Sequence, residues 1–438
     1  MPVCASRARG TGPSPRRAHG NGRRIGVALT RGAPLATERE DPIRGAAALS
    51  CTPEAGLGAA EAADAVAVAL EGACDLAVVF ATAEHIEAVE AVAAAVEARL
   101  EPGVLVGGIA QGVLGAGEEV ESGPAVTVWG VRLATGHAQP FRSWAVPGPD
   151  GGVAVAGWPD SRPGDLVVVL ADPYSFPAAE VATHVGDRWP GHLLTGGLIT
   201  GGPGRSRLLL DDQVHEDGAV GVVLSELDVA AVVSQGCRPI GDPLTVTAAD
   251  RNRILELGGE PATVRLQQLL HDSDPEVREL LRHGGLQLGL VVDEVRDDYG
   301  PGDFLVRGVL AIDADAGSLT VGDLPRVGQT VQFHVRDAAS ADQDLAQRLA
   351  EQPAAAAALL FTCNGRGRGL FGTADHDVTA VESTVGGAVA GAFCAGEIGP
   401  VGVRSYLHGF TASLALVGTD VRGSDAPDDR GGQGPIAV

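Results

Sequence analysis

The stretches DLAVVFAT (Asp75–Thr82) and DLVVVLAD (Asp165–Asp172) decide the fold, because each begins a longer segment that occurs more than once in the chain. Each is succeeded by a second apolar run, LVGGI at Leu105–Ile109 and LTGGL at Leu194–Leu198. The first runs are offset by 90 residues, from 75 to 165, and the glycine pairs by 89, from 107 to 196. Such self-similarity indicates one supersecondary unit that is used more than once.

A third, weaker copy lies near the C-terminus, where Leu359–Thr362 is followed about thirty residues later by Val389–Phe393. Every copy reads as an apolar run, a helical stretch, a second apolar run that ends in small residues, and one or two further strands. We expect a functional site where the copies meet. The paired glycines at Gly107–Gly108 and Gly196–Gly197 recur at equivalent places, so we interpret them chiefly as packing features.

The helices of the first two copies are marked by different signals. Glu84–Leu100 carries apolar residues at spacings of three and four, which predicts one amphipathic helix. In the second copy, Ser175 precedes a helical stretch that has Pro177 in its first turn, which is typical of a helix start.

The predicted fold is mixed α/β, in two lobes. Within each copy the two strands joined by a helix should be parallel, and the closely spaced strands after them should turn back antiparallel. After Gly241 the pattern changes to alternating strands with short turns, which places a domain boundary near 235–240. We therefore expect domains at 24–236 and 237–420, a disordered Arg-rich leader at 1–23 and a disordered tail at 421–438.

Charge and cysteine usage exclude several classes of function. The net charge is −24, and residues 1–24 contain six arginines and no acid, so the remainder is more acidic still. Such a body repels nucleic acid and anionic membranes, and no apolar run is long enough to span a bilayer. Six cysteines without a CxxC pair indicate neither a disulfide scaffold nor a zinc site, so a cytoplasmic location fits best.

Several segments together resemble a known family. DLAVVFATAEH, the LVGGI strand before Gln111–Gly112, and LLTGGLITGG at Leu193–Gly202 resemble the FIST N domain. FTCNGRG at Phe361–Gly367, VAGAFCAGEIGP at Val389–Pro400 and the closing strand FTASLALVG are similar to the FIST C domain. The family name abbreviates F-box and intracellular signal transduction, and the resemblance covers about residues 25–420.

The resemblance implies a cytoplasmic sensory module that binds small ligands such as amino acids, often fused to signalling output domains. No histidine-kinase, GGDEF, PAS or F-box segment is visible in this sequence. We therefore expect a small-molecule ligand, amino-acid-like or another small charged metabolite, and a separate output protein as partner.

Candidate ligand-binding residues follow from the rule that ligands sit at the carboxyl ends of strands in parallel α/β units. A guanidinium there can hold a carboxylate and an acid can hold an ammonium group. The candidates selected by this rule are Arg366, Asn364, Cys363 and Glu397 from the third copy, with Asp172 and Ser175 from the second. Arg404 of the third copy is a further candidate. The alternative is a purely structural role, in which Arg366 and Glu397 only bridge surface loops.

Other patterns give weaker alternatives. Gly367, Gly369 and Gly372 match a GxGxxG spacing, so the main alternative function is an enzyme that binds a nucleotide or thioester through the Gly365–Gly372 loop. A flexible turn is the commoner interpretation of this spacing.

Cys363 and Cys394 could act as nucleophiles, but buried cysteines are usually inert. The loop Asp211–Glu216 is more often a solvated turn than a metal site, so no metal or cofactor is indicated. A scaffold for protein partners without a ligand is the third possibility.

Overall fold

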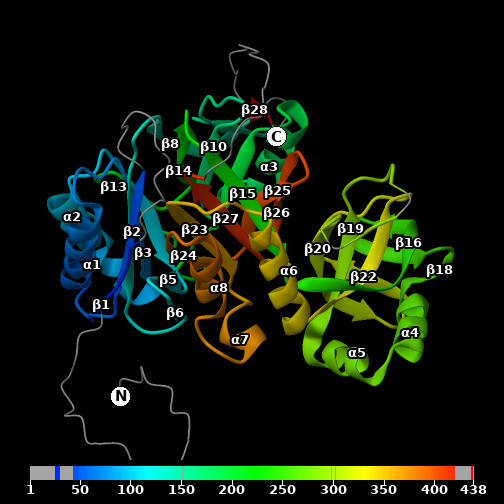
Figure 1. Cartoon of the computed structure of the whole chain (residues 1–438). Helices are drawn as coiled ribbons and strands as arrows, with labels where there is room; N and C mark the ends of the chain where they lie inside the picture. Colours follow the sequence, from blue (N-terminus) through cyan, green and yellow to red (C-terminus); the bar gives the residue numbers. More distant parts are fainter. Residues whose placement is uncertain are drawn as a thin grey trace, which may run out of the picture.

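The computed structural model describes residues 25–29, 43–148, 152–296, 298–300, 302–419 and 436–437. The predicted mixed α/β fold in two lobes is confirmed. Residues 237–336 build the smaller lobe, which lies on the right in Figure 1, and described residues on both sides of that range build the larger one. The predicted leader and most of the predicted tail lie outside the described residues, although Ile436–Ala437 of that tail form a strand.

The three sequence copies have the same strand arrangement. In each, the first strand runs parallel to the strand after its helix and antiparallel to a later strand, as the sequence predicted. The three central strands of copy one are, in spatial order, β7 (Val126–Arg132), β3 (Leu76–Thr82) and β4 (Val104–Ala110). Those of copy two are β14 (Ala219–Ser225), β10 (Leu166–Ala171) and β11 (Leu193–Leu198). Those of copy three are β27 (Thr411–Val417), β23 (Ala357–Cys363) and β24 (Ala388–Cys394).

Each copy donates a short hairpin to the sheet of another copy. The hairpin of copy one pairs with β24 of copy three, that of copy two with β4 of copy one, and that of copy three with β11 of copy two. The exchange is therefore cyclic, and every copy is completed by another. The hairpins are β5 (Val113–Gly115) with β6 (Glu118–Val120), β12 (Leu208–Leu210) with β13 (Gln213–His215), and β25 (Glu397–Val401) with β26 (Arg404–His408).

Further strands extend the far side of each sheet. They pair antiparallel beside β7, β14 and β27, so the three sheets have the same construction on this side as well. These strands are β2 (Arg44–Ser50) and β1 (Ile25–Leu29) in the first sheet, β8 (His137–Pro147), β9 (Val153–Ala156) and β28 (Ile436–Ala437) in the second, and β15 (Val229–Gln235) in the third.

The inner faces of the three sheets share one hydrophobic core. Alternate residues of a strand point to opposite faces, so the side chains of each first strand divide between this central core and a local one. The central core contains Phe80 of β3, Leu170 of β10 and Phe361 of β23. Phe80 and Phe361 meet edge to face with their ring centroids 6.2 Å apart. The copies are thus held together by apolar burial at their common centre.

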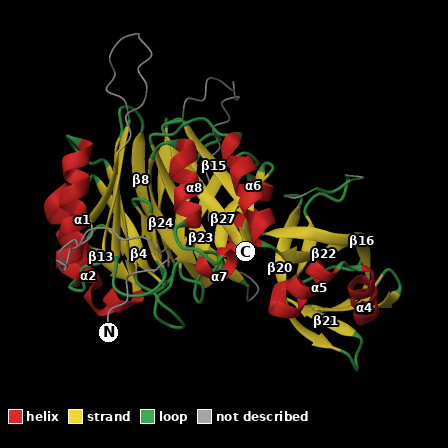
Figure 2. Cartoon of the chain, turned by 60° about the horizontal axis from the view of Figure 1, so that its bottom comes forward, coloured by secondary structure: helices red, strands yellow, loops and turns green. Residues whose placement is uncertain are grey.

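Helices cover the outer faces, as Figure 2 shows for α1 and α2 on one side and for α6 and α8 on another. The predicted helix Glu84–Leu100 is two elements, because Ala88 at φ −129° interrupts it. The prediction that Ser175 opens a helix was wrong, since that helix begins at Ala178 and no side chain caps it. The helices of this lobe are α1 (Ala55–Leu70), η1 (Ala83–Ala88), α2 (Val89–Leu100), α3 (Ala178–Arg188), α6 (Ala338–Ala350), α7 (Arg368–Phe371) and α8 (His376–Val385).

The smaller lobe is a sheet that closes on itself, because its first strand also pairs with β17. Closure satisfies strand edges that would otherwise be exposed. Its strands, in spatial order, are β16 (Cys237–Asp250), β22 (Thr330–Arg336), β19 (Leu286–Val291), β20 (Phe304–Asp313), β21 (Ser318–Val321), β17 (Arg253–Leu257) and β18 (Glu260–Pro261), and its helical elements are α4 (Ala262–Asp272), α5 (Pro275–Leu280) and η3 (Leu281–Gly285).

One glycine per copy has a packing role that the sequence repeat predicted for the first two copies. Gly107, Gly196 and Gly391 occupy the same register position opposite the first strand of their copies. A Cβ added to them would lie 1.9, 1.9 and 1.7 Å from the carbonyl oxygens of that strand. No side chain fits at this distance, so each parallel pair requires glycine here.

We predict that Gly391→Ala lowers the free energy of unfolding by about 3 kcal/mol or more, because the new methyl group collides with the backbone of β23. Chemical denaturation of the variant and of wild type measures this change. The control is Gly369→Ala, whose Cβ would meet nothing within 4 Å. It should leave stability unchanged or raise it by up to about 1 kcal/mol; equal effects of the two substitutions would contradict this role of the glycine.

Candidate functional site

The third copy differs from the other two at two positions that the repeat makes equivalent. By strand register, Glu397 corresponds to Val113 and Leu208 in the other hairpins, and all three side chains are buried. At the ends of the first strands, Cys363 corresponds to Thr82 and to a buried aspartate, Asp172. Placing a carboxyl group where the related hairpins have apolar residues costs stability, so the exchange to Glu397 points to a function in this copy.

Glu397 is fully buried between the second and third sheets. Its Oε2 accepts hydrogen bonds from the backbone N–H of Thr411, at 3.2 Å, and from the Thr411 hydroxyl, at 2.8 Å. Burial raises the pKa of Glu397 to about 8, although Thr411 and then the Arg366 guanidinium act to lower it. Much of the Glu397 population therefore carries a proton at neutral pH.

Arg366 is also buried, and it forms a two-bond ion pair with Asp377 at the start of α8. Nε lies 2.7 Å from Oδ2 of Asp377, and Nη2 lies 2.9 Å from Oδ1. Burial would raise the pKa of Asp377, but the guanidinium outweighs it and holds that pKa well below its usual value. The pair fixes the orientation of the guanidinium, which also lies 5.2 Å from the ring centroid of Phe371.

The carboxylate of Asp377 is held by two further side chains. The Thr362 hydroxyl donates to Oδ2 at 2.7 Å, and Nδ1 of His376 lies 3.0 Å from Oδ1. The other imidazole nitrogen of His376 lies 3.0 Å from Asp342 of α6, and the ring stacks on Phe371. The Arg366 guanidinium is therefore supported by a network that reaches the surface.

Four buried polar atoms of the third copy and of the end of β22 have no hydrogen-bond partner among the described residues. They are Nη1 of Arg366, Oε1 of Glu397, Oδ1 of Asn364 and Nη2 of Arg336. Buried polar groups are almost always hydrogen-bonded, since leaving one unpaired costs about 1–3 kcal/mol. Two of these atoms are donors and two are acceptors, and a polar guest or water molecules would satisfy them. We call Cys363, Asn364, Arg366, Glu397 and Arg336 the Cys363 site.

The structure thus brings together four of the residues selected from the sequence, namely Cys363, Asn364, Arg366 and Glu397. Arg336 was missed, because it ends a strand of the smaller lobe and no sequence signal relates it to the third copy. Its guanidinium lies against Gly365, where an added Cβ would be 3.3 Å from Nη2, and 5.8 Å from the ring centroid of Phe410.

Cys363 has an environment that favours the neutral thiol. Its sulfur accepts from the backbone N–H of Gly365 at 3.4 Å. Burial, followed by the charge of Glu397, raises the pKa of Cys363 to about 12, and burial also raises the pKa of Cys237 to about 12. Nucleophilic cysteines need the opposite shift, so the thiol is better suited to contact a ligand than to attack one.

The glycine-rich loop of the GxGxxG pattern is occupied by the protein itself. Gly367 adopts φ 62° before α7, and Gly372 ends that short helix at φ 71°. The N–H of Arg368, which would face a phosphate in a dinucleotide site, donates to the Glu121 carboxylate at 2.9 Å. Glu121 directly follows the hairpin of copy one, and its negative charge repels phosphate. This contact argues against nucleotide binding by the Gly365–Gly372 loop.

Three of the residues selected from the sequence lie elsewhere. Arg404 is on the edge strand β26 and pairs with Asp187 of α3. The carboxylate of Asp172 accepts from the hydroxyls of Ser175 and Ser206, and the Ser175 hydroxyl accepts from the backbone N–H of Gly218. Asp172 and Ser175 therefore close the loops of copy two.

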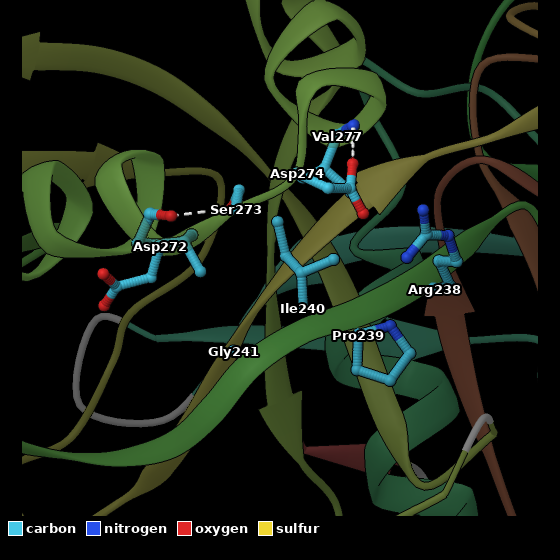
Figure 3. A pocket seen from close by; sticks show the side chains of 9 residues that line it. Arg238, Pro239, Ile240, Gly241, Asp272, Ser273, Asp274 and Val277 are labelled. Carbon is cyan, nitrogen blue, oxygen red and sulfur yellow. Dashed lines mark hydrogen bonds between the residues drawn. The ribbon is translucent and has the colours of Figure 1, made fainter.

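A separate hollow of about 370 Å³ opens in the smaller lobe, beside α4 and α5 (Figure 3). Its polar side chains serve local structure: Arg238 pairs with Asp337, Ser273 donates to the carbonyl of Leu269, and Asp274 caps α5 through the N–H of Val277. Arg238 follows Cys237 along a strand, so their side chains point to opposite faces. We consider the Cys363 site the stronger candidate, because its buried groups lack partners.

Two general findings concern metals and membranes. Within the described ranges, no three or more His, Cys, Asp or Glu side chains are arranged to hold a metal ion. Asp211 of the acidic loop instead accepts from the N–H of Leu105. No helix in the described part of the chain is both long and apolar enough to cross a membrane.

Comparison with known proteins finds two family models and several relatives that match the chain. Residues 75–260 match the FIST N domain and residues 262–400 match the FIST C domain. An uncharacterized protein of Mycobacterium tuberculosis strain H37Rv is 44% identical over 380 residues, which cover 84% of this chain and 98% of the relative. An uncharacterized protein of Mycobacterium bovis is 43% identical over 380 residues, or 84% of this chain and 97% of that protein.

Breaking the central ion pair should be costly. Asp377→Asn leaves the Arg366 charge buried without a counter-charge, so we expect the free energy of unfolding to fall by about 3–5 kcal/mol. Urea denaturation measures it. The matched control is Asp64→Asn, at an ion pair with Arg99 whose side chains are 55% and 49% exposed; there the loss should stay below about 1 kcal/mol. Similar losses for both variants would contradict the structural role of the Arg366–Asp377 pair.

Proposed function

The chain belongs to the FIST family, a sensory domain type of signal transduction, and on that premise we propose that it detects a small amino-acid-like ligand at the Cys363 site. The observation that carries the proposal is the set of unpaired buried atoms. Two belong to guanidinium groups and two are oxygen acceptors. An α-amino acid has the complementary pair of groups, a carboxylate and an ammonium.

The carboxylate of the ligand would lie between Arg366 and Arg336. Arg366 already has Nε and Nη2 bound to Asp377, so its free Nη1 is held in place before any ligand arrives. Hydrogen bonds between charged groups are about twice as strong as neutral ones, and a preorganised donor loses little conformational entropy on binding.

The ammonium group would be held by Oε1 of Glu397 and Oδ1 of Asn364. Glu397 is the stronger partner only when ionised, and its pKa of about 8 means that an ammonium ligand must first displace a proton at neutral pH. The positive charge of the ligand offsets the cost of burying the ionised Glu397 carboxylate, for which the described residues provide no ion pair.

Signal transduction needs more than binding, because a ligand shifts an equilibrium only by its difference in affinity for the two states. We propose that a separate protein reads the resulting state and that the protein acts in the cytoplasm. Cys74, Cys237, Cys363 and Cys394 are free thiols, which supports a reducing compartment.

A thermal-shift screen with the individual protein amino acids, small organic acids and nucleotides tests the proposal. A ligand at one hundred times its Kd raises native-state stability by about 2.7 kcal/mol. We expect stabilisation by at least one amino acid and a smaller stabilisation in Glu397→Gln. The control is Glu119→Gln, a buried carboxyl that accepts from the N–H of Val378 on α8 and has a pKa of about 7. Stabilisation by nucleotides alone would favour an enzyme, and no stabilisation at all would favour a scaffold.

The affinity for an amino acid should rise with pH. Only the ionised form of Glu397 holds an ammonium, so with a pKa of about 8 the affinity should increase about 25-fold between pH 6.5 and pH 8.5. Isothermal titration at the two pH values measures it, and Glu397→Gln should abolish the dependence. A ligand that has a carboxylate but no ammonium should show the reverse trend, because ionised Glu397 repels it. That trend for every ligand found would overturn the ammonium role of Glu397.

A further inference from the structure

The smaller lobe joins the larger one through two connections that run side by side. The chain enters it between β15 and β16 at Gly236, and leaves it between β22 and α6 at Asp337. Cys237 and Arg336, its first and last residues, are paired in register. The N–H of Asp337 also lies 3.5 Å from the carbonyl oxygen of Gly236. Anything that holds both connections therefore holds the lobe.

Both connections are pressed against the Cys363 site. A Cβ added to Gly236 would lie 2.3 Å from the carbonyl oxygen of Phe410 and 3.2 Å from Nη1 of Arg366. Arg336 reaches back over Gly365 and the Phe410 ring, and its Nη2 is one of the four unpaired buried atoms. The entry connection thus touches the guanidinium of Arg366, and the exit connection supplies a second guanidinium.

From this placement we infer that Arg336 is the ligand-binding residue contributed by the smaller lobe, and that a carboxylate shared by Arg336 and Arg366 fixes the orientation of that lobe. The inference rests on the proposed function, because it names the residue through which the same ligand acts on the second lobe.

Charge makes a carboxylate the natural bridge. Arg366 is already neutralised by Asp377, whereas no acidic partner of Arg336 is found within the described ranges. A guest with a negative charge can pair with Arg336 and still accept a hydrogen bond from Nη1 of Arg366. Because the sheet of the smaller lobe closes on itself, a force on Arg336 moves the lobe as one body.

The experiment uses glycine, the smallest zwitterion, as the probe. Its affinity is measured by isothermal titration for wild type, for Arg336→Gln and for the control Arg265→Gln, which alters an arginine of α4 bonded to the carbonyl of Leu257. Lobe orientation is followed as a distance between spin labels on non-natural side chains at Val68 and Leu324, which are 78% and 69% exposed. Such labels leave the native thiols unmodified.

We expect glycine to change the distance distribution in wild type and in Arg265→Gln. In Arg336→Gln, binding should weaken about tenfold or more, which corresponds to one lost charge-assisted contact, and the distance should no longer respond. Glycine binding that is equal in Arg336→Gln and wild type would overturn the inference and leave the proposed function standing. Weaker binding in this variant with no glycine-dependent distance change in wild type would overturn the role in lobe orientation. If wild type binds neither glycine nor any amino acid of the thermal-shift screen, both proposals are overturned.

Discussion

The larger lobe depends on the burial of three sheet faces against one another. Each first strand sends alternate side chains into the common core, where Phe80 and Phe361 meet edge to face. No sheet is complete without the hairpin of another copy. Because each copy contributes to two sheets, the loss of one unit exposes apolar surface in the others, and the lobe should fold as a single cooperative body.

This architecture explains why a functional site can arise in one copy alone. The repeated positions at the strand ends and in the hairpins have the same backbone surroundings three times, so the fold requires only a side chain that fills the space. Copies one and two place Val113 and Leu208 in the hairpin position, while copy three places Glu397 there. The smaller lobe is inserted after β15, the edge strand of the third sheet, and this brings Arg336 against Gly365 of the same copy.

The charges of the site form a hierarchy. Asp377 neutralises Arg366 and orients it, and His376 and Thr362 hold Asp377 in turn. No ion pair to Glu397 is found among the residues that the structure describes, and burial raises its pKa to about 8. A guanidinium whose charge is neutralised by Asp377, close to an under-compensated carboxyl group, makes the site sensitive to the charge of whatever enters it. This is a property suited to recognition, and it agrees with the sensory character of the family.

Local pattern was enough to predict the repeat, the parallel and antiparallel pairing within each copy, and the role of Gly107 and Gly196, because these follow from hydrophobic spacing and backbone sterics within about ninety residues. It also led to the selection of Cys363, Asn364, Arg366 and Glu397, which follow strands of one copy; their role in ligand binding stays a prediction. The exchange of hairpins and the position of Arg336 at the Cys363 site depend on contacts between residues that are far apart in the chain. The packing of apolar side chains between the copies sets these contacts. Asp172 fits the same strand-end rule, yet its carboxylate binds a hydroxyl of its own loop, and Arg404 begins an edge strand and pairs with Asp187.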